Sequence, residues 1–478
     1  MEMRLMIETE GPDGPGHSTI AAEGRYWRLT EPLDISSDTL PKYACASYVW
    51  GDERLQNPIH PSITMSDRTL PTFAAVVRHA PGCAIWIDAF CVPVEPNKKR
   101  PTLESLGFIF SRAESVVAVV AAESLAAMRE MKATVGVISC QLNPPADLMR
   151  RPLDTLDTDM WIRSVWTYQE VVNNPGMLWF ASTAGDQPAI DSMDVLQAVG
   201  GYMLAYSKVN PQYADIHHRH VMDFEILLID CHMGAFVRRS AFIIMSGLKN
   251  RTYLEPANYF YSMMGALTTQ PSSRTTNPTL EGLAERFMQL CEEKGDYSFI
   301  FSARERDARP GLRWRPLPGI LRPVLTWHCY GEGQPGRRVE EGILLEKVAV
   351  FTPVPSEQHS EDALWSWARL PLARWVESLA VTGVEPEVLA VQIRRVLNHF
   401  VGFSGTGDTF LTENGVFYAQ EVLPEGEVCI CVSREVRWTF GAPGIAKVDS
   451  NGDVSYTPGV FIGDVRSDTI EVTDFILH

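Results

Sequence analysis

Three runs of apolar residues, separated by amphipathic stretches, dominate the first quarter of the chain. Residues 43–50, 84–90 and 115–121 are almost entirely apolar or aromatic, with Asp88 the main exception, which is typical of strands buried on both faces. Residues 69–79 and 103–113 lie between them and carry apolar side chains at helical spacing. Strands that alternate with helices predict a parallel sheet with helices packed on its faces.

The pattern changes along the rest of the chain. Residues 1–25 are rich in Gly, Pro and acidic residues and predict a loose terminus, so the α/β domain is expected to span 26–190. Helical periodicity dominates residues 191–305. Residues 306–478 predict an α+β region, with strands at 343–352, 410–418, 427–438 and 460–476 and a helix at 384–400.

Composition narrows the class of protein. With 478 residues, 45% of them hydrophobic, the chain is long enough for two or three folded domains. A net charge of −17 argues against binding to nucleic acids or anionic membranes. Nine scattered cysteines suit a reducing compartment, and no apolar run approaches the roughly 20 residues that cross a bilayer. The opening residues also lack a signal peptide, so we predict a cytoplasmic protein without a membrane span.

Polar residues follow the predicted strands where a parallel sheet binds its ligands, at the carboxyl ends. Asp88 interrupts an apolar run, and an unpaired buried carboxylate costs several kcal/mol. It is therefore expected either to face a ligand crevice or to cap nearby backbone. Asp52 follows Gly51 directly, where it is either a site residue or an ordinary turn residue.

Residues 161–172 predict one helix in which Arg163, Trp166 and Glu170 share a face. A guanidinium, an indole and a carboxylate in one stripe could bind an anionic, aromatic ligand. The alternative is an intrahelical ion pair between Arg163 and Glu170 beside a core tryptophan. His217 and His220 also share a helical face, but no further ligand lies at metal-binding spacing, so no metal site is predicted.

Three stretches together resemble the signature blocks of the fungal heterokaryon-incompatibility (HET) domain, in the family's order. They are YACASYVWGD at 43–52, IWIDAFCV at 85–92 and WIRSVWTYQE at 161–170. The stretch RTYLEPANYFYSMMGAL at 251–267 resembles the segment that follows such domains. The loop after Cys91 departs from the family's polar pattern, with Val92-Pro93-Val94-Glu95 and Lys98-Lys99-Arg100 in its place.

The HET fold is thought to be related to Toll/interleukin-receptor (TIR) domains, which implies a TIR-like (flavodoxin-like) parallel sheet. The segment from Ser47-Tyr48 to Gly51-Asp52 is similar to the first strand end and loop of TIR domains. The spacing from Trp166 to Glu170 matches the Trp-Cys-x-x-Glu motif of NAD-cleaving members, with Thr167 in place of Cys. The resemblance implies two catalytic carboxylates, Glu170 and Asp88, and a nucleotide-binding set made of Ser47, Tyr48, Trp50, Gly51, Asp52, Cys91, Arg163 and Trp166.

The resemblance further implies a role in non-self recognition and regulated cell death. The resemblance to NAD-cleaving TIR domains implies that NAD is the substrate and is cleaved to nicotinamide and ADP-ribose without a metal or prosthetic group. A carboxylate suits that reaction because it stabilises the oxocarbenium-like sugar. Two alternatives stay open: a non-enzymatic signalling module that self-associates as a homo-oligomer, and a HET scaffold recruited to another small-molecule transformation.

Overall fold

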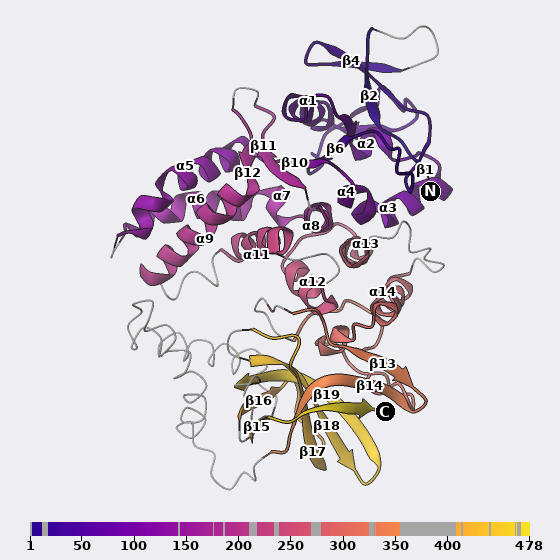
Figure 1. Ribbon diagram of the computed structural model, residues 1–478, viewed down its shortest axis with the longest axis vertical. Helices are drawn as coiled ribbons and strands as arrows, with labels where there is room; N and C mark the ends of the chain where they lie inside the picture. The colour runs from indigo at the N-terminus through magenta and orange to yellow at the C-terminus, as the bar shows by residue number, and fades with distance from the viewer. Residues whose placement is uncertain are drawn as a thin grey trace. The chain divides into compact units, whose positions relative to one another are not determined.

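A computed structural model describes most of the chain. The residues outside it are 1, 12–17, 142–143, 175, 185–186, 210–217, 234–238, 269–278, 325–328, 330, 354–407, 413, 439–440, 464 and 466–469. The helix predicted at 384–400 and His217 therefore lie outside the described residues. The chain divides into two compact units, one formed by residues 1–236 and 250–278 and the other by 237–249 and 279–478 (Figure 1).

The first unit is built on an eight-stranded sheet with a parallel centre. Four parallel strands lie in the order β11 (Met177–Ala181), β10 (Ser115–Val119), β6 (Tyr43–Ser47) and β9 (Ala84–Trp86). Antiparallel strands flank them, with β12 (Ile190–Asp191) beside β11, and β2 (Met6–Thr9), β4 (Arg25–Leu29) and β3 (Thr19–Ala22) beyond β9. The structure is thus of the predicted α/β class, but its sheet is mixed.

The antiparallel strands beyond β9 come from a segment whose composition predicted a loose terminus. That prediction is wrong for residues 2–11 and 18–25, which include three strands. Leu5, Met6 and Ile20 are buried there. Few apolar residues are thus enough to hold this segment, because each of them packs against an existing sheet.

Helices cover the sheet and extend from one edge. The predicted helix at 69–79 is confirmed as α1 (Thr69–His79), which buries Phe73, Val76 and Val77 and contacts β6, β9 and β10. α5 (Ala122–Ser139), α6 (Ala146–Thr158) and α9 (Ser192–Val209) pack side by side (Figure 1). The other helices named below are α2 (Asp88–Cys91), α3 (Pro96–Glu104), α4 (Leu106–Ser111), α7 (Met160–Arg163), α8 (Trp166–Val172), α11 (Arg219–Met233) and α13 (Pro256–Leu267). The unit also has two small antiparallel pairs, β1 (Glu2–Met3) with β5 (Leu33–Asp34) and β7 (Arg54–Gln56) with β8 (Thr64–Ser66).

The single helix predicted over 161–172 is wrong in one respect, because the chain breaks it into α7 and α8. Ser164 is extended, with ψ of 137°. It forms a parallel bridge with Thr252, whose backbone N–H donates to the carbonyl of Arg163 at 2.6 Å. Backbone hydrogen bonds to a distant segment thus replace those of a continuous helix, which no local pattern reveals.

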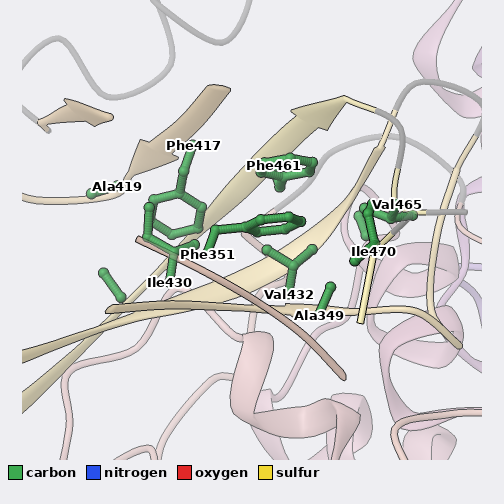
Figure 2. Close-up of a cluster of buried hydrophobic side chains, with 11 residues drawn as sticks. Ala349, Phe351, Phe417, Ala419, Ile430, Val432, Phe461, Val465 and Ile470 are labelled. Carbon is green, nitrogen blue, oxygen red and sulfur yellow. The ribbon is translucent and has the colours of Figure 1, made fainter. Parts of the chain in front are cut away.

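The second unit contains an antiparallel sheet. Its strands run β13 (Gly336–Val339), β14 (Gly342–Phe351), β17 (Glu427–Ser433), β18 (Gly441–Ser450), β19 (Asp453–Gly463), β16 (Gly415–Ala419) and β15 (Thr409–Thr412), with β20 (Val472–Leu477) also paired to β14. Strands occur in all four stretches predicted after residue 306. One face buries an apolar cluster in which the rings of Phe351 and Phe461 stack 4.8 Å apart (Figure 2).

The helices of the second unit are α12 (Ala241–Leu248) and α14 (Leu280–Lys294), with a short 3₁₀ helix, η2 (Ser298–Phe301). Every residue of α12 is buried, and α12 contacts η2. α14 ends at Gly295, whose φ of 76° closes the helix in the left-handed conformation that glycine adopts most easily. Among the described helices of both units, none is long and apolar enough to cross a membrane.

Candidate functional site

The candidate site lies where the parallel strands β6 and β9 end. Ser47 is the last residue of β6, and Tyr48 and Trp50 follow it. Asp88 comes two residues after β9, as the first residue of α2 rather than within a strand as predicted. Parallel strands end at one edge of a sheet, so these two segments meet there.

Asp88 accepts three hydrogen bonds in this position. The hydroxyl of Tyr48 donates to Oδ1 at 2.9 Å and the indole N–H of Trp50 donates to Oδ2 at 2.7 Å. The backbone N–H of Ala89 also donates to Oδ1 at 2.6 Å. The predicted bond to nearby backbone is therefore present, and Asp88 also binds side chains that follow the neighbouring strand, while its role toward a ligand stays a prediction.

Burial raises the pKa of Asp88, while the hydrogen bonds from Tyr48, Trp50 and Ala89 oppose that rise. The positive charge of Lys99, on α3, also lowers it. Three donors and a nearby cation favour the charged form of a carboxylate. Burial nevertheless outweighs them, so the pKa of Asp88 lies above the usual range of an aspartate.

Glu170, on α8, reaches the same edge from a third segment. The hydroxyl of Ser47 donates to Glu170 Oε2 at 2.5 Å, and the indole N–H of Trp161 donates to Ser47 Oγ at 2.8 Å. Ser47 and Trp161 are buried, whereas Glu170 keeps part of its surface exposed. The first and third blocks therefore meet at the Ser47 hydroxyl, and the second block joins the first through the bonds of Asp88 to Tyr48 and Trp50.

The protonation of Glu170 is strongly shifted. Burial raises its pKa to about 8, the bond from Ser47 opposes this, and the negative charge of Asp88 raises it further. At neutral pH most Glu170 side chains therefore carry a proton, in a place where a cationic group bound nearby would favour the charged form. Two carboxyl groups with different partners thus lie at one edge of the sheet, where Asp88 is bonded to Tyr48 and to Trp50, which is 38% exposed.

Arg163 and Trp166 point to other neighbours. The expectation that Arg163 shares a helical face with Glu170 is wrong, because α7 ends at Arg163 and a new helix begins at Trp166, whereas Trp166 and Glu170 do share a face of α8. The charge of Arg163 acts on His220 of α11, and the ring of Trp166 stacks on Tyr261 of α13 at 6.5 Å. Among the described residues Arg163 forms no ion pair with Glu170. A ligand-binding role for Arg163 and Trp166 stays a prediction.

The remaining predicted residues are local parts of the framework. Gly51 donates its backbone N–H to Ser66 Oγ at 2.7 Å, and a Cβ in its place would lie 2.2 Å from Asp67 Oδ1, so a larger residue would require the Asp67 side chain to move. Asp52, beside it, is exposed. Cys91 is buried, which raises the pKa of its thiol to about 12. A nucleotide-binding role for these three residues also stays a prediction.

Sequence reasoning missed two contributors to the site. Trp161 opens the third quoted block, but spacing alone marks it as a core residue. Lys99 lies in a stretch predicted to be a loop, which is in fact α3. Its proximity to Asp88 depends on how α2 and α3 pack. No group of three His, Cys, Asp or Glu side chains in the described part of the chain is arranged to hold a metal.

Fold and site together define an α/β domain with paired carboxyl groups at the carboxyl ends of its central strands. Residues 43–170 match the family model described as Heterokaryon incompatibility protein (HET). This segment is therefore a HET domain, which confirms the resemblance of the three blocks and implies a function related to heterokaryon incompatibility. No curated protein and no solved structure gives a match to the chain.

Proposed function

We propose that this HET domain, with a TIR-like fold, cleaves NAD to nicotinamide and ADP-ribose and thereby acts in non-self recognition and cell death. The observation that supports this most is the position of Glu170. Its carboxyl group is hydrogen-bonded to Ser47 at the end of β6 and is coupled to Asp88 at the end of β9. Ligands of parallel sheets bind at this edge.

The chemistry of the bond suits these residues. When the bond between the ribose and the nicotinamide nitrogen breaks, both bonding electrons go to the nitrogen, so neutral nicotinamide leaves and the sugar becomes oxocarbenium-like. Ionised Glu170 stabilises that positive charge, and Asp88 adds to the negative potential. Water then bonds to the sugar carbon and loses its proton to a carboxylate or to solvent. The exposed ring of Trp50 provides a stacking surface for a flat ligand.

The test is incubation of the purified full-length protein with NAD, as monomer and as any assembled form, with nicotinamide measured over time. Glu170→Gln keeps the size of the side chain but cannot ionise, so we expect nicotinamide release to fall more than about a hundredfold, roughly 3 kcal/mol of transition-state stabilisation. The matched control is Glu114→Gln, an exposed carboxylate of the same unit that pairs with Lys42. It should retain the wild-type rate.

Two further outcomes separate the alternatives. If neither form of the wild-type protein releases nicotinamide and NAD leaves the melting temperature unchanged, the enzyme proposal is rejected and a self-associating signalling module takes its place. If NAD has no effect but another small molecule raises the melting temperature by mass action, the crevice serves a different transformation. Equal rates for wild type and Glu170→Gln would show that Glu170 is not the catalytic carboxylate.

A further inference from the structure

The chain turns from the end of α7 into the start of α8 over residues 162–167. This turn is held by a side chain outside the segment that matches the HET family. We call these six residues the elbow. The guanidinium of Arg251 donates from Nη1 to the carbonyl of Ile162 at 3.1 Å and to that of Ser164 at 2.9 Å. It also donates to the hydroxyl of Thr167 at 2.9 Å. One side chain thus contacts both sides of the elbow.

Neighbouring residues of the same distant segment also form hydrogen bonds with the elbow. The backbone of Thr252 exchanges hydrogen bonds with the elbow, donating to the carbonyl of Arg163 and accepting from the N–H of Val165 at 3.0 Å. On α13, the hydroxyl of Ser262 donates to the carbonyl of Val165 at 2.7 Å. The carbonyl groups that a continuous helix would pair internally are therefore satisfied by residues 251–262.

A straight helix could not build the site. Residues 161 and 170 are nine positions apart, which in an α-helix means about 13.5 Å along the axis and about 180° around it. In the structure both side chains nevertheless reach Ser47, the indole of Trp161 from one side and the carboxyl of Glu170 from the other. The elbow is what allows two residues of neighbouring helices to meet at one hydroxyl.

Arg251 is suited to this task by its shape and not by its charge alone. Its side chain is 4% exposed, and burial lowers its pKa, while Asp223, Tyr168 and Asp230 oppose that shift. Holding a cation in such a place is unfavourable unless its donors are used. Nη1 makes all three bonds to the elbow, while Nη2 donates to the carbonyl of Asp223 on α11 at 3.5 Å. The planar guanidinium thus joins the elbow to α11 through two nitrogens in a fixed fork, which the single ammonium nitrogen of lysine cannot reproduce.

We propose that Arg251 is a positioning residue for Glu170, and that residues 250–262 are part of the functional site although they lie beyond the matched 43–170. The expected effect on catalysis rests on the proposed function, whereas the expected effect on the position of Glu170 does not. Without the fork of Arg251 the elbow relaxes, α8 shifts, and the carboxyl of Glu170 leaves its half-buried place beside Ser47.

The experiment compares Arg251→Lys with wild type in the full-length chain. The titration of Glu170 is followed by NMR of ¹³C-labelled glutamate carboxyls and assigned by its absence in Glu170→Gln. The groups whose charge or hydrogen bond acts on Glu170 are Ser47 and Asp88, and Glu170 in turn acts on Tyr48 and Cys45. None of them is altered. The control, Arg25→Lys, makes the same exchange at an arginine of β4 that pairs with Glu8 on β2 and has no bond to the elbow.

In wild type the Glu170 carboxyl should titrate near pH 8. In Arg251→Lys we expect its pKa to fall by about one unit or more toward the ordinary range of a solvated carboxyl, with kcat for nicotinamide release reduced about tenfold or more. Arg25→Lys should titrate and react as wild type does. If wild type releases no nicotinamide but the titration shifts as expected, the positioning role stands and the proposed enzymatic function fails.

A folded Arg251→Lys protein in which Glu170 titrates and reacts as in wild type, with only the melting temperature lowered, would overturn the proposal. If Arg251→Lys does not fold, Ser262→Ala takes its place, because it removes a single hydrogen bond to the elbow. A downward shift of the Glu170 pKa in that variant supports the proposal, and an unchanged titration overturns it.

Discussion

Folding makes ionisation of the Glu170 carboxyl group less favourable. Its pKa rises from 4.5 to about 8, chiefly through burial. Between those values the unfolded chain releases the proton while the folded protein keeps it. The folded state then binds more protons than the unfolded state, so stability falls as pH rises through that interval. The contribution of Glu170 is fully present below about pH 4.5 and is lost by about pH 8.

This linkage gives a measurable prediction. A shift of that size corresponds to about 5 kcal/mol for a fully buried group, and partial exposure of Glu170 reduces the expectation to about 2 kcal/mol. Free energies of unfolding from urea titrations at pH 5 and pH 8.5 should show wild type losing about that much relative to Glu170→Gln, which does not ionise. A difference between the two proteins that is independent of pH would show that Glu170 is solvated.

At this scale the sequence indicated the two carboxylates but not all of their partners. Asp88 stood out as a charged residue in an apolar segment, where burial of a carboxylate demands a reason. Glu170, Ser47 and Tyr48 were named through the resemblance to TIR domains. Arg251 was not found, since its role depends on carbonyl groups about 90 positions away that are free only because a helix breaks.

Helix packing beside the site depends on the absence of side chains at two glycines. A Cβ on Gly107 of α4 would lie 1.9 Å from the carbonyl oxygen of Gly265 on α13. One on Gly265 would lie 1.6 Å from the side-chain oxygen of Gln169, next to Glu170 on α8. α4, α8 and α13 therefore approach one another closely, and α8 is held at a fixed distance from both neighbours.

We expect Gly107→Ala to lower the free energy of unfolding by about 2 kcal/mol or more, since backbone rather than a flexible side chain must move. The matched control is Gly136→Ala on α5, where a Cβ meets nothing within 4 Å. That change should be neutral or stabilising by up to about 1 kcal/mol, because alanine favours the helix. Urea midpoints measure both. Equal stability of the two variants would contradict the close approach of α4 and α13.

The spacing of apolar residues predicted a helix with one apolar face and the strands that are buried in the centre of the sheet. α1 and the central strands β6, β9 and β10 appear where apolar spacing placed them. The antiparallel strands of the first 29 residues did not follow from composition, because a few apolar residues in a polar segment suffice once a sheet edge is present. The elbow was missed for a related reason, since distant backbone decides the local conformation there.

For the molecule as a whole, the matched segment and the structural unit have different limits. The family match ends at Glu170, whereas the first unit continues to residue 236 and resumes at 250–278. α8 contacts α11 and α13, both of which lie after the match. The sequence favoured a boundary near residue 190 because the periodicity becomes helical there, but a change of element type does not mark the limit of a hydrophobic core.

A comparison of two fragments tests which limit governs folding. Residues 1–190 lack α11, α13 and Arg251, so Tyr168 and Val171, which are fully buried in the unit, lose part of their cover. We expect this fragment to show no cooperative thermal transition by circular dichroism. Residues 1–278, with 237–249 replaced by a Gly/Ser linker of equal length because that stretch belongs to the second unit, should unfold cooperatively. Cooperative unfolding of the shorter fragment, with Glu170 still titrating near pH 8, would confine the functional unit to the matched segment and contradict a role for Arg251.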